Sequence, residues 1–265
     1  MDFNEPRILG KTGWRVGRLG VAGGYGAPAE VLEEAFERGC NYFYWGSFRR
    51  PGMAEAIRNL VRRGKRDQLV VVVQVYNRLA GMMAGSVERA LRKGNLDHAD
   101  VLLLGWHNSL PSARILEAAH RLKERGLVKS LAMSGHHRPI FPVAAETGIF
   151  EILHIRYNAA HRGAETEVFQ KLPAANRPGI VTYTATRWGR LLKPKKMPAG
   201  EKTPRASDCY RFVLSNPAVD VCMAGPKNRE EMREAFATLE RGPLNEEEMA
   251  WMRRVGGHVH ARGWF

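Results

Sequence analysis

Apolar and polar positions follow two alternating patterns along the chain. Short, almost continuous apolar runs predict buried strands, and they recur at 18–25, 40–45, 69–76, 100–107, 130–136, 151–158, 179–186 and 220–225. Between them, apolar residues recur every three or four positions, as in "SARILEAAHRLKERG", which predicts helices with one buried face. The helices are expected to end at Gly39, Gly64, Gly94, Gly126 and Gly148.

Strands that alternate with helices over about 250 residues predict a single (β/α)8 TIM barrel, with residues 1–265 forming one domain. A doubly wound sheet is the alternative, but "AGGYGAP" resembles its GxGxxG fingerprint only loosely. Before the first strand, "RILGKTGWRVGRLG" predicts a β-hairpin that turns at "KTG" and could close the barrel floor. The longest loop is expected over 192–206.

The net charge of +14 at pH 7 admits two readings. One is a nucleic-acid binder, and the other is an enzyme with an arginine-rich surface that binds an anionic cofactor. The densest basic runs, 62–66 and 193–196, lack interleaved aromatic residues and match no nucleic-acid module. We therefore expect a small-molecule substrate and no nucleic-acid partner.

Cysteine usage and apolar runs bear on the compartment. The sequence contains no run of about 18 apolar residues, so we expect no membrane span. The first residues contain no apolar signal core, so we do not expect export. The cysteines, Cys40, Cys209 and Cys222, form no CxxC pair and no Cys/His ligand spacing. We expect a cytoplasmic protein without a metal site.

Several segments, in order, resemble motifs of the aldo-keto reductases. They are "R-x-LGKTG-x-x-V-x-x-LG" at the start, "ERGCNYF", "GLVKSLAMSGH", "YN" at 157–158, "TYTATRWGRLL" at 182–192 and "GPKNREEMREA" at 225–235. The resemblance spans nearly the whole chain. It implies a barrel that reduces carbonyls with NADPH, in which a Tyr protonates the nascent alkoxide, a Lys lowers the pKa of that Tyr, an Asp holds the Lys and a His orients the carbonyl. Fold alone does not imply this activity, so the site residues decide it.

All four catalytic positions implied by the resemblance carry other residues. Where the family motif reads N-x-F-D-T-A-x-x-Y, Tyr44 replaces the Asp and Arg49 replaces the Tyr. Gln74 stands for the Lys and Gly105 for the His. Arginine, with a pKa above about 12, donates no proton at ordinary pH, and a neutral amide cannot lower the pKa of a phenol. The family's proton relay therefore cannot operate here in its usual form.

Other proton donors are expected near the ends of the strands. Tyr44, Tyr76 and His107 would lie at the end of the barrel where such folds hold their active sites, although each could instead be structural.

Four further residues are candidates for substrate binding. Trp45 and Trp106 would form an aromatic rim for a flat or apolar substrate. Arg49 could bind a carboxylate or phosphate, with Gln74 beside it, or could be a plain surface arginine.

The cofactor positions implied by the resemblance are better retained. Ser134 matches the residue that bonds the nicotinamide carboxamide, although Gly135 replaces its Asn neighbour. His154 stands where a Gln contacts the same group, and Tyr183 matches the aromatic residue that stacks on nicotinamide. Barrel packing is the alternative role of Tyr183.

Basic residues near the end of the chain complete the implied cofactor site. Lys227 and Arg233 resemble the pair that holds the 2′-phosphate of NADPH, and Arg190 is a candidate for the pyrophosphate. The helix that starts after "AGPKN" offers further N–H donors to phosphate. Ala235 replaces the family's Asn at the adenine, and Lys227 and Arg233 could also be solvated helix charges.

The sequence leaves more than one function open. The first is an NADP(H)-binding oxidoreductase with a non-standard active site, acting on a small anionic or aromatic substrate of the carbonyl or imine type. The alternative is a catalytically inactive ligand-binding or regulatory protein on the same barrel. A cofactor-independent lyase or isomerase is a third reading, but no residue stands out as its acid or base.

Overall fold

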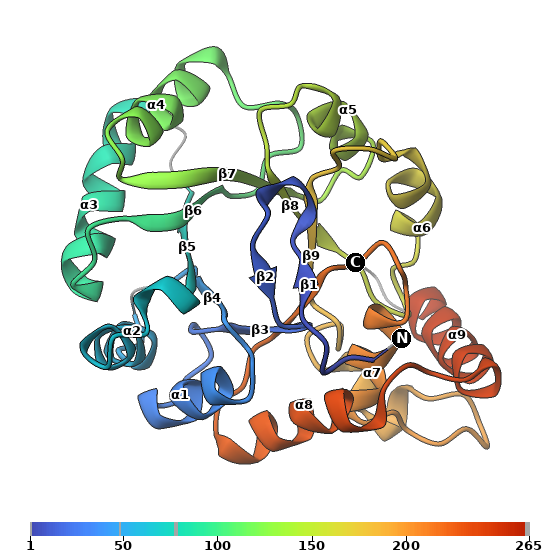
Figure 1. The fold of residues 1–265 in the computed structure, drawn as a ribbon. Coiled ribbons are helices and arrows are strands. Elements are labelled where there is room, and N and C mark those ends of the chain that lie inside the picture. The colour runs from blue at the N-terminus through green and yellow to red at the C-terminus, as the bar shows by residue number, and fades with distance from the viewer. Residues whose placement is uncertain (1, 48, 77–78, 263–265) are drawn as a thin grey trace.

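The computed structural model describes residues 2–47, 49–76 and 79–262. In it, parallel strands close into a barrel in the order β10-β3-β4-β5-β6-β7-β8-β9 (Figure 1). The barrel strands are β3 Leu19–Ala22, β4 Tyr42–Trp45, β5 Val70–Val75, β6 Ala99–Leu104, β7 Val128–Gly135, β8 Ile152–Arg156, β9 Gly179–Tyr183 and β10 Val221–Ala224. Each overlaps one predicted strand, so the (β/α)8 prediction is confirmed and the doubly wound alternative is excluded.

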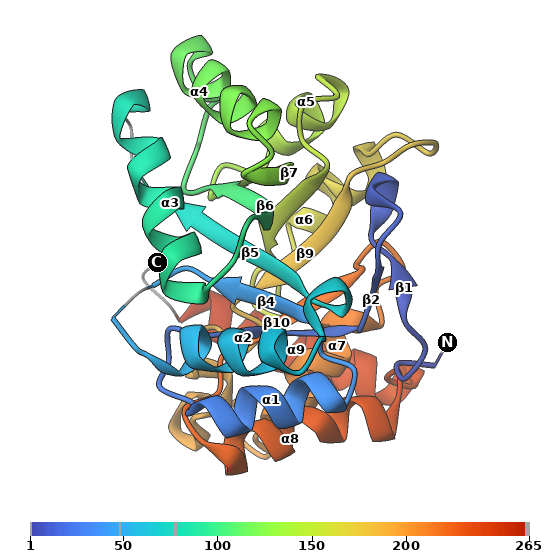
Figure 2. The ribbon, with the colours of Figure 1, turned by 60° about the vertical axis from the view of Figure 1, so that its left-hand side comes forward.

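Helices surround the barrel on its outer side (Figures 1 and 2). They are α1 Ala29–Glu37, α2 Gly52–Arg62, α3 Met83–Gly94, α4 Ala113–Glu124, α5 Ile140–Glu146, α6 Ala164–Glu167, α7 Ala206–Leu214, α8 Arg229–Arg241 and α9 Glu246–Ala261. Across the described ranges, none is both long and apolar enough to cross a membrane. The segment between β9 and α7 contains only short 3-10 turns at Arg190–Leu192 and Pro194–Lys196, as expected for a loop.

Left-handed residues end most of the predicted helices. Gly39, Gly64, Gly126 and Gly148 have φ values of 87°, 71°, 72° and 71°, which glycine adopts without a steric cost. The end of α3 differs from the prediction because Gly94 is its last helical residue and Asn95 takes the left-handed position at φ 52°. Asparagine is the next most tolerant residue there, because its short polar side chain bonds locally.

Strand alternation divides the core into two layers. On β5, Val70 and Val72 face the barrel interior, whereas Val71 and Val73 pack outward beneath the helices. The same alternation on every strand leaves the interior filled by side chains, as a barrel of this size requires. Only the inward-facing residues nearest the strand ends can therefore line a site.

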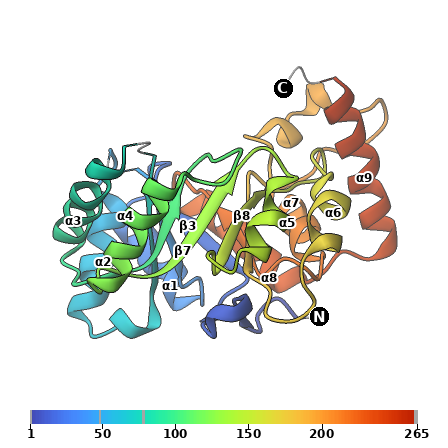
Figure 3. The same cartoon turned by 90° about the horizontal axis from the view of Figure 1, so that it is seen from above.

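The predicted hairpin is confirmed. β1 Arg7–Ile8 pairs with β2 Arg15–Val16 and lies across one end of the barrel (Figure 2), with Gly13 at the turn at φ 75°. Leu9 and Val16 are fully buried among the interior residues. The hairpin therefore closes the floor. Figure 3 shows it on one side of the barrel, with the segment between β9 and α7 on the other.

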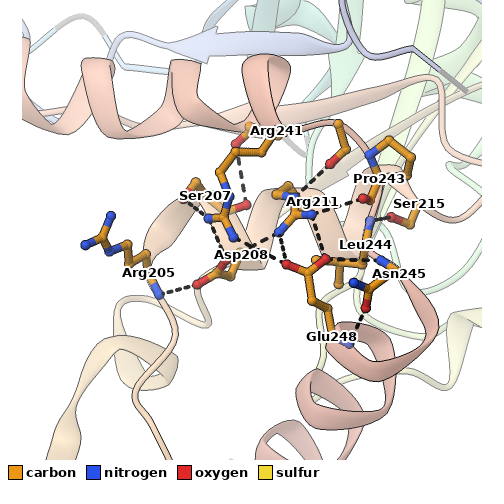
Figure 4. A network of polar contacts seen from close by, with 12 residues as sticks. Arg205, Ser207, Asp208, Arg211, Ser215, Arg241, Pro243, Leu244, Asn245 and Glu248 are labelled. Carbon is orange, nitrogen blue, oxygen red and sulfur yellow. Dashed lines mark hydrogen bonds and ion pairs between the residues drawn. The ribbon is translucent and has the colours of Figure 1, made fainter.

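A polar network joins the last three helices (Figure 4). The Arg211 guanidinium on α7 donates two 2.7 Å hydrogen bonds to the Glu248 carboxylate on α9 and a third, also 2.7 Å, to the Gly242 carbonyl. Asp208 on α7 pairs with Arg241 on α8 at 2.7 Å. Arg211 and Asp208 are buried at the centre of the network, which fixes the start of α7 against α8, and both segments border a cavity described below.

Candidate active site

Two connected cavities open at the end of the barrel opposite the hairpin. The smaller one, the pocket, has a volume of about 240 Å³ and reaches down to the barrel interior. The larger one, the groove, has a volume of about 960 Å³ and runs between the segment after β9 and the start of α8. The two share five wall residues, Tyr25, Thr184, Trp188, Met223 and Gly225. A molecule lying in the groove can therefore extend into the pocket.

Two phenols and an amide meet in the pocket. The Tyr44 hydroxyl donates a hydrogen bond to Gln74 Oε1 and lies 3.4 Å from the Tyr76 hydroxyl. Burial, reinforced by the neighbouring Tyr76, raises the pKa of Tyr44 well above its ordinary value. Tyr44 therefore stays protonated and acts as a hydrogen-bond donor. Tyr76 is half exposed and faces the pocket opening.

Two glycines make room for this arrangement. A Cβ on Gly46 would collide with the Tyr44 hydroxyl, and a Cβ on Gly105 would collide with Gln74 Nε2. The absence of a side chain at Gly105 therefore leaves the space that the Gln74 side chain occupies.

His154 forms the floor of the pocket beside Tyr44. Its Nε2 lies 2.8 Å from the Tyr42 hydroxyl, and its ring centroid lies 6.1 Å from that of Tyr44. Burial lowers the pKa of His154 to about 3, so the imidazole is neutral at physiological pH. A neutral imidazole can donate or accept a hydrogen bond without adding charge to the pocket.

Ser134, His154 and Tyr183 come together in the pocket, as the cofactor prediction requires. Ser134 Oγ accepts a hydrogen bond from the Trp106 amide at 3.2 Å, which leaves its own proton available. The Tyr183 hydroxyl donates to the Gly135 carbonyl at 2.9 Å. Because Gly135 lies on β7 and Tyr183 on β9, the Tyr183 ring spans β8 and forms a flat wall.

Lys227 and Arg233 line the groove near the start of α8. The Lys227 ammonium lies 3.5 Å from the Glu231 carboxylate, and both basic side chains are exposed. α8 is capped by Asn228, which accepts a hydrogen bond from the Glu231 amide at 2.9 Å. Arg205 lines the groove opposite them, where α7 begins.

The structure does not bring four predicted residues to either cavity. Trp45 is 1% exposed and packs outward beneath the helices, and His107 is buried behind Ser134, whose carbonyl accepts its amide at 2.7 Å. Arg49 is exposed outside the pocket, and Arg190 lies outside the residues that line the groove.

Two aromatic residues of the pocket, Tyr25 and Trp188, escaped the sequence predictions. Both lie in loops that follow barrel strands, as does His136, which the sequence offers as a further polar group after the fifth predicted strand and which also lines the pocket. The sequence feature that could have identified them is their position, because residues just beyond the barrel strands form the active site in this fold. No group of three or more metal-ligating side chains occurs within the described ranges, and the three cysteines are buried free thiols.

Comparisons with known proteins bear on the family and the fold. A family model described as "Aldo/keto reductase family" matches residues 25–208. Aldo-keto reductase AKR11C1 from Bacillus halodurans, in its holo form, superposes with a TM-score of 0.77 at 17% identity, covering 95% of this chain and 96% of that chain. An aldo/keto reductase from Klebsiella pneumoniae, solved with NADP and acetate, gives 0.76 at 20% identity, covering 96% of each chain. Among curated proteins, no sequence matches significantly. The chain belongs to the aldo/keto reductase family.

Proposed function

We propose that the protein is an NADP(H)-dependent oxidoreductase that acts on a small carbonyl or imine compound. The observation that carries this proposal is the continuity of the groove with the pocket through Tyr25 and Trp188. Membership of the family supports it. So does the Klebsiella relative, which was solved with NADP.

The residues of the two cavities fit a dinucleotide. At one end of the groove, Lys227, Arg233 and the start of α8 offer positive charge and amide donors to phosphate. At the pocket end, Ser134 and His154 offer polar groups to a carboxamide, and Tyr183 offers a flat ring. We assign these five residues to cofactor binding, with the 2′-phosphate favouring NADP(H) over NAD(H).

A bound NADPH supplies the hydride. The chain supplies a hydrogen-bond donor to the substrate atom that gains electron density, and we assign this role to Tyr76, with Tyr44 beside it as a positioning residue. The Tyr44 hydroxyl donates its proton to Gln74, so its oxygen can only accept a hydrogen bond, and it lies 3.4 Å from the Tyr76 hydroxyl that it helps to position. Within the described ranges, no lysine, arginine or carboxylate lines the pocket. No charged side chain in the described part of the chain therefore assists proton transfer in the pocket, which favours substrates already activated by conjugation or by protonation of an imine.

The test is steady-state NADPH oxidation with a panel of activated aryl aldehydes and cyclic imines. We expect turnover of at least one member, reduced about 100-fold by Tyr76→Phe, as is typical for loss of a positioned proton donor. Val143→Ala, an exposed apolar change on α5, serves as the control and should leave the rate unchanged. Turnover that survives both Tyr76→Phe and Tyr44→Phe would refute the roles assigned here.

One observation favours the alternative, a ligand-binding protein without catalysis. The Tyr44 proton is committed to Gln74, and burial holds it there. This alternative predicts saturable NADPH binding without turnover of any panel member by either nicotinamide cofactor. A single substrate whose turnover depends on Tyr76 excludes it.

We also propose that the protein functions in the cytoplasm as one domain. Three buried free thiols suit a reducing compartment. Mass spectrometry of thiols alkylated in intact cells tests this proposal: a disulfide between any two of them would contradict it.

A further inference from the structure

Arg156 is the uppermost inward-facing residue of β8. Along this strand, Ile152 packs in the barrel interior and His154 lines the pocket, whereas Leu153 and Ile155 pack outward. Alternation therefore turns Arg156 to the inner side, at the strand end where barrels place functional residues. Its side chain is half-buried.

The strand register places Arg156 between two residues of the pocket wall. Its Cα pairs with that of Tyr183 on β9. On the other side, Ile155 pairs with Gly135 on β7, so His136 follows directly opposite Arg156. Both neighbours line the pocket. The backbone of Arg156 thus lies between two residues of the pocket wall, beside the residues that line the pocket and not among them.

No carboxylate neutralises this arginine within the described ranges. The two acidic residues of the next helix are already paired, Glu165 with Arg253 at 3.2 Å and Glu167 with Arg138 at 2.7 Å.

The effects of this charge reach the pocket wall. Burial lowers the pKa of His136, and the nearby Arg156 charge lowers it further. Burial raises the pKa of Tyr183, and the same Arg156 charge opposes that rise. Arg187, 1% exposed and close enough to feel Arg156, has a buried Nε without a hydrogen-bond partner. A half-buried guanidinium without a carboxylate partner can bind an anion without first breaking an ion pair.

Two tryptophans flank the pocket opening. Trp106 is 60% exposed and Trp188 is 58% exposed, and both line the pocket. Both have a positive φ, 57° and 51°, which is strained for a bulky side chain and is found mainly at functional sites. The Trp106 ring meets Tyr76 edge to face at 5.1 Å, which gives a deep apolar wall.

We propose that the pocket takes a flat aromatic compound that carries a carboxylate, bound through Arg156 at the rim while the ring lies against Trp106 and Trp188. As a substrate class, an aromatic oxo acid or its imine, this rests on the proposed function. The guanidinium can bond both carboxylate oxygens at once, so Arg156 supplies orientation as well as charge.

The experiment compares two ligands that no hydride can reduce, 2-naphthoate and its neutral isostere 2-naphthamide. Binding is measured by isothermal titration calorimetry without cofactor, for the wild type, Arg156→Gln and Arg138→Gln. Arg138→Gln is the matched control because it removes the same charge nearby, from an arginine that Glu167 already neutralises.

We expect wild type and Arg138→Gln to bind naphthoate at least about tenfold more tightly than naphthamide, the scale of a charge-assisted pair. Arg156→Gln should lose this preference and bind naphthamide unchanged, which also shows that it folds. Raising the salt concentration should weaken naphthoate binding to the wild type and leave Arg156→Gln unaffected.

Equal affinity for both ligands, or equal losses for both in Arg156→Gln, would overturn the inference. Its failure is separable from that of the proposed function, because the titration involves no nicotinamide. Carboxylate-selective binding without any NADPH turnover would support the carboxylate site and would refute only the proposed oxidoreductase activity.

Discussion

Replacing His154 by glutamine tests whether the imidazole in the pocket floor is neutral. Its Nε2 is bonded to the Tyr42 hydroxyl, and the residue is 3% exposed. Burial lowers the pKa of His154 to about 3, against about 6.5 in an unfolded chain. Between these values the unfolded state binds one more proton than the folded state, so stability is lost as the pH falls.

The size of the loss follows from the shift. At pH 5 the unfolded imidazole is mostly protonated and the folded one is almost entirely neutral. The gap of about 1.5 pH units to the unfolded pKa, at about 1.4 kcal/mol per unit, gives about 2 kcal/mol. Glutamine does not titrate and can still bond to Tyr42. His154→Gln should therefore remove about 2 kcal/mol from the stability difference between pH 7 and pH 5.

Urea unfolding followed by circular dichroism at pH 7 and pH 5 measures this difference. His120→Gln, a change at an exposed position on α4, is the control and should leave the difference close to that of the wild type. If His154→Gln loses as much stability between the two pH values as the wild type does, the imidazole is not held neutral by burial.

Three further predictions concern packing and charge. Gly105→Ala should cost about 1–3 kcal/mol, because its Cβ collides with Gln74, and most of this cost should vanish in a Gln74→Ala background when urea unfolding compares the four proteins. Hydrogen bonds from Arg211 lower the pKa of Glu248 to about 2, so Glu248 stabilises the fold above the unfolded pKa of about 4.5 and that contribution is lost as the pH falls towards 2. Acid titration of Glu248→Gln should show a shallower loss over this window, and an unchanged curve would contradict the assignment. Asp220→Asn should cost about 3–5 kcal/mol by thermal unfolding, because the fully buried carboxylate accepts a bidentate guanidinium, and a loss below about 1 kcal/mol would count against that bond.

Strand positions were readable from the sequence because each buried strand is a dense apolar run, and the glycine after a helix marks its end through a conformation other residues avoid. The alternation of side chains along a strand also determines the direction in which Trp45 points. Since Tyr44 faces the pocket, its neighbour on β4 must face outward, and it does. That placement followed from the sequence once Tyr44 was assigned inward.

The loops could not be read in this way. Tyr25 and Trp188 lie in segments without periodicity, and their directions depend on backbone angles such as the φ of 51° at Trp188. The fit between Gln74 and Gly105 joins residues from two strands, and only the closed barrel shows that one side chain occupies the space left by the other.

The central claim is that this barrel retains a dinucleotide site while the groups that protonate the substrate have changed. Calorimetric titration of the wild type with NADPH and with NADH tests it most directly. The account predicts one saturable site per chain, at least about tenfold tighter for NADPH, and loss of that preference in Lys227→Ala/Arg233→Ala. Absence of saturable binding up to millimolar NADPH would contradict it.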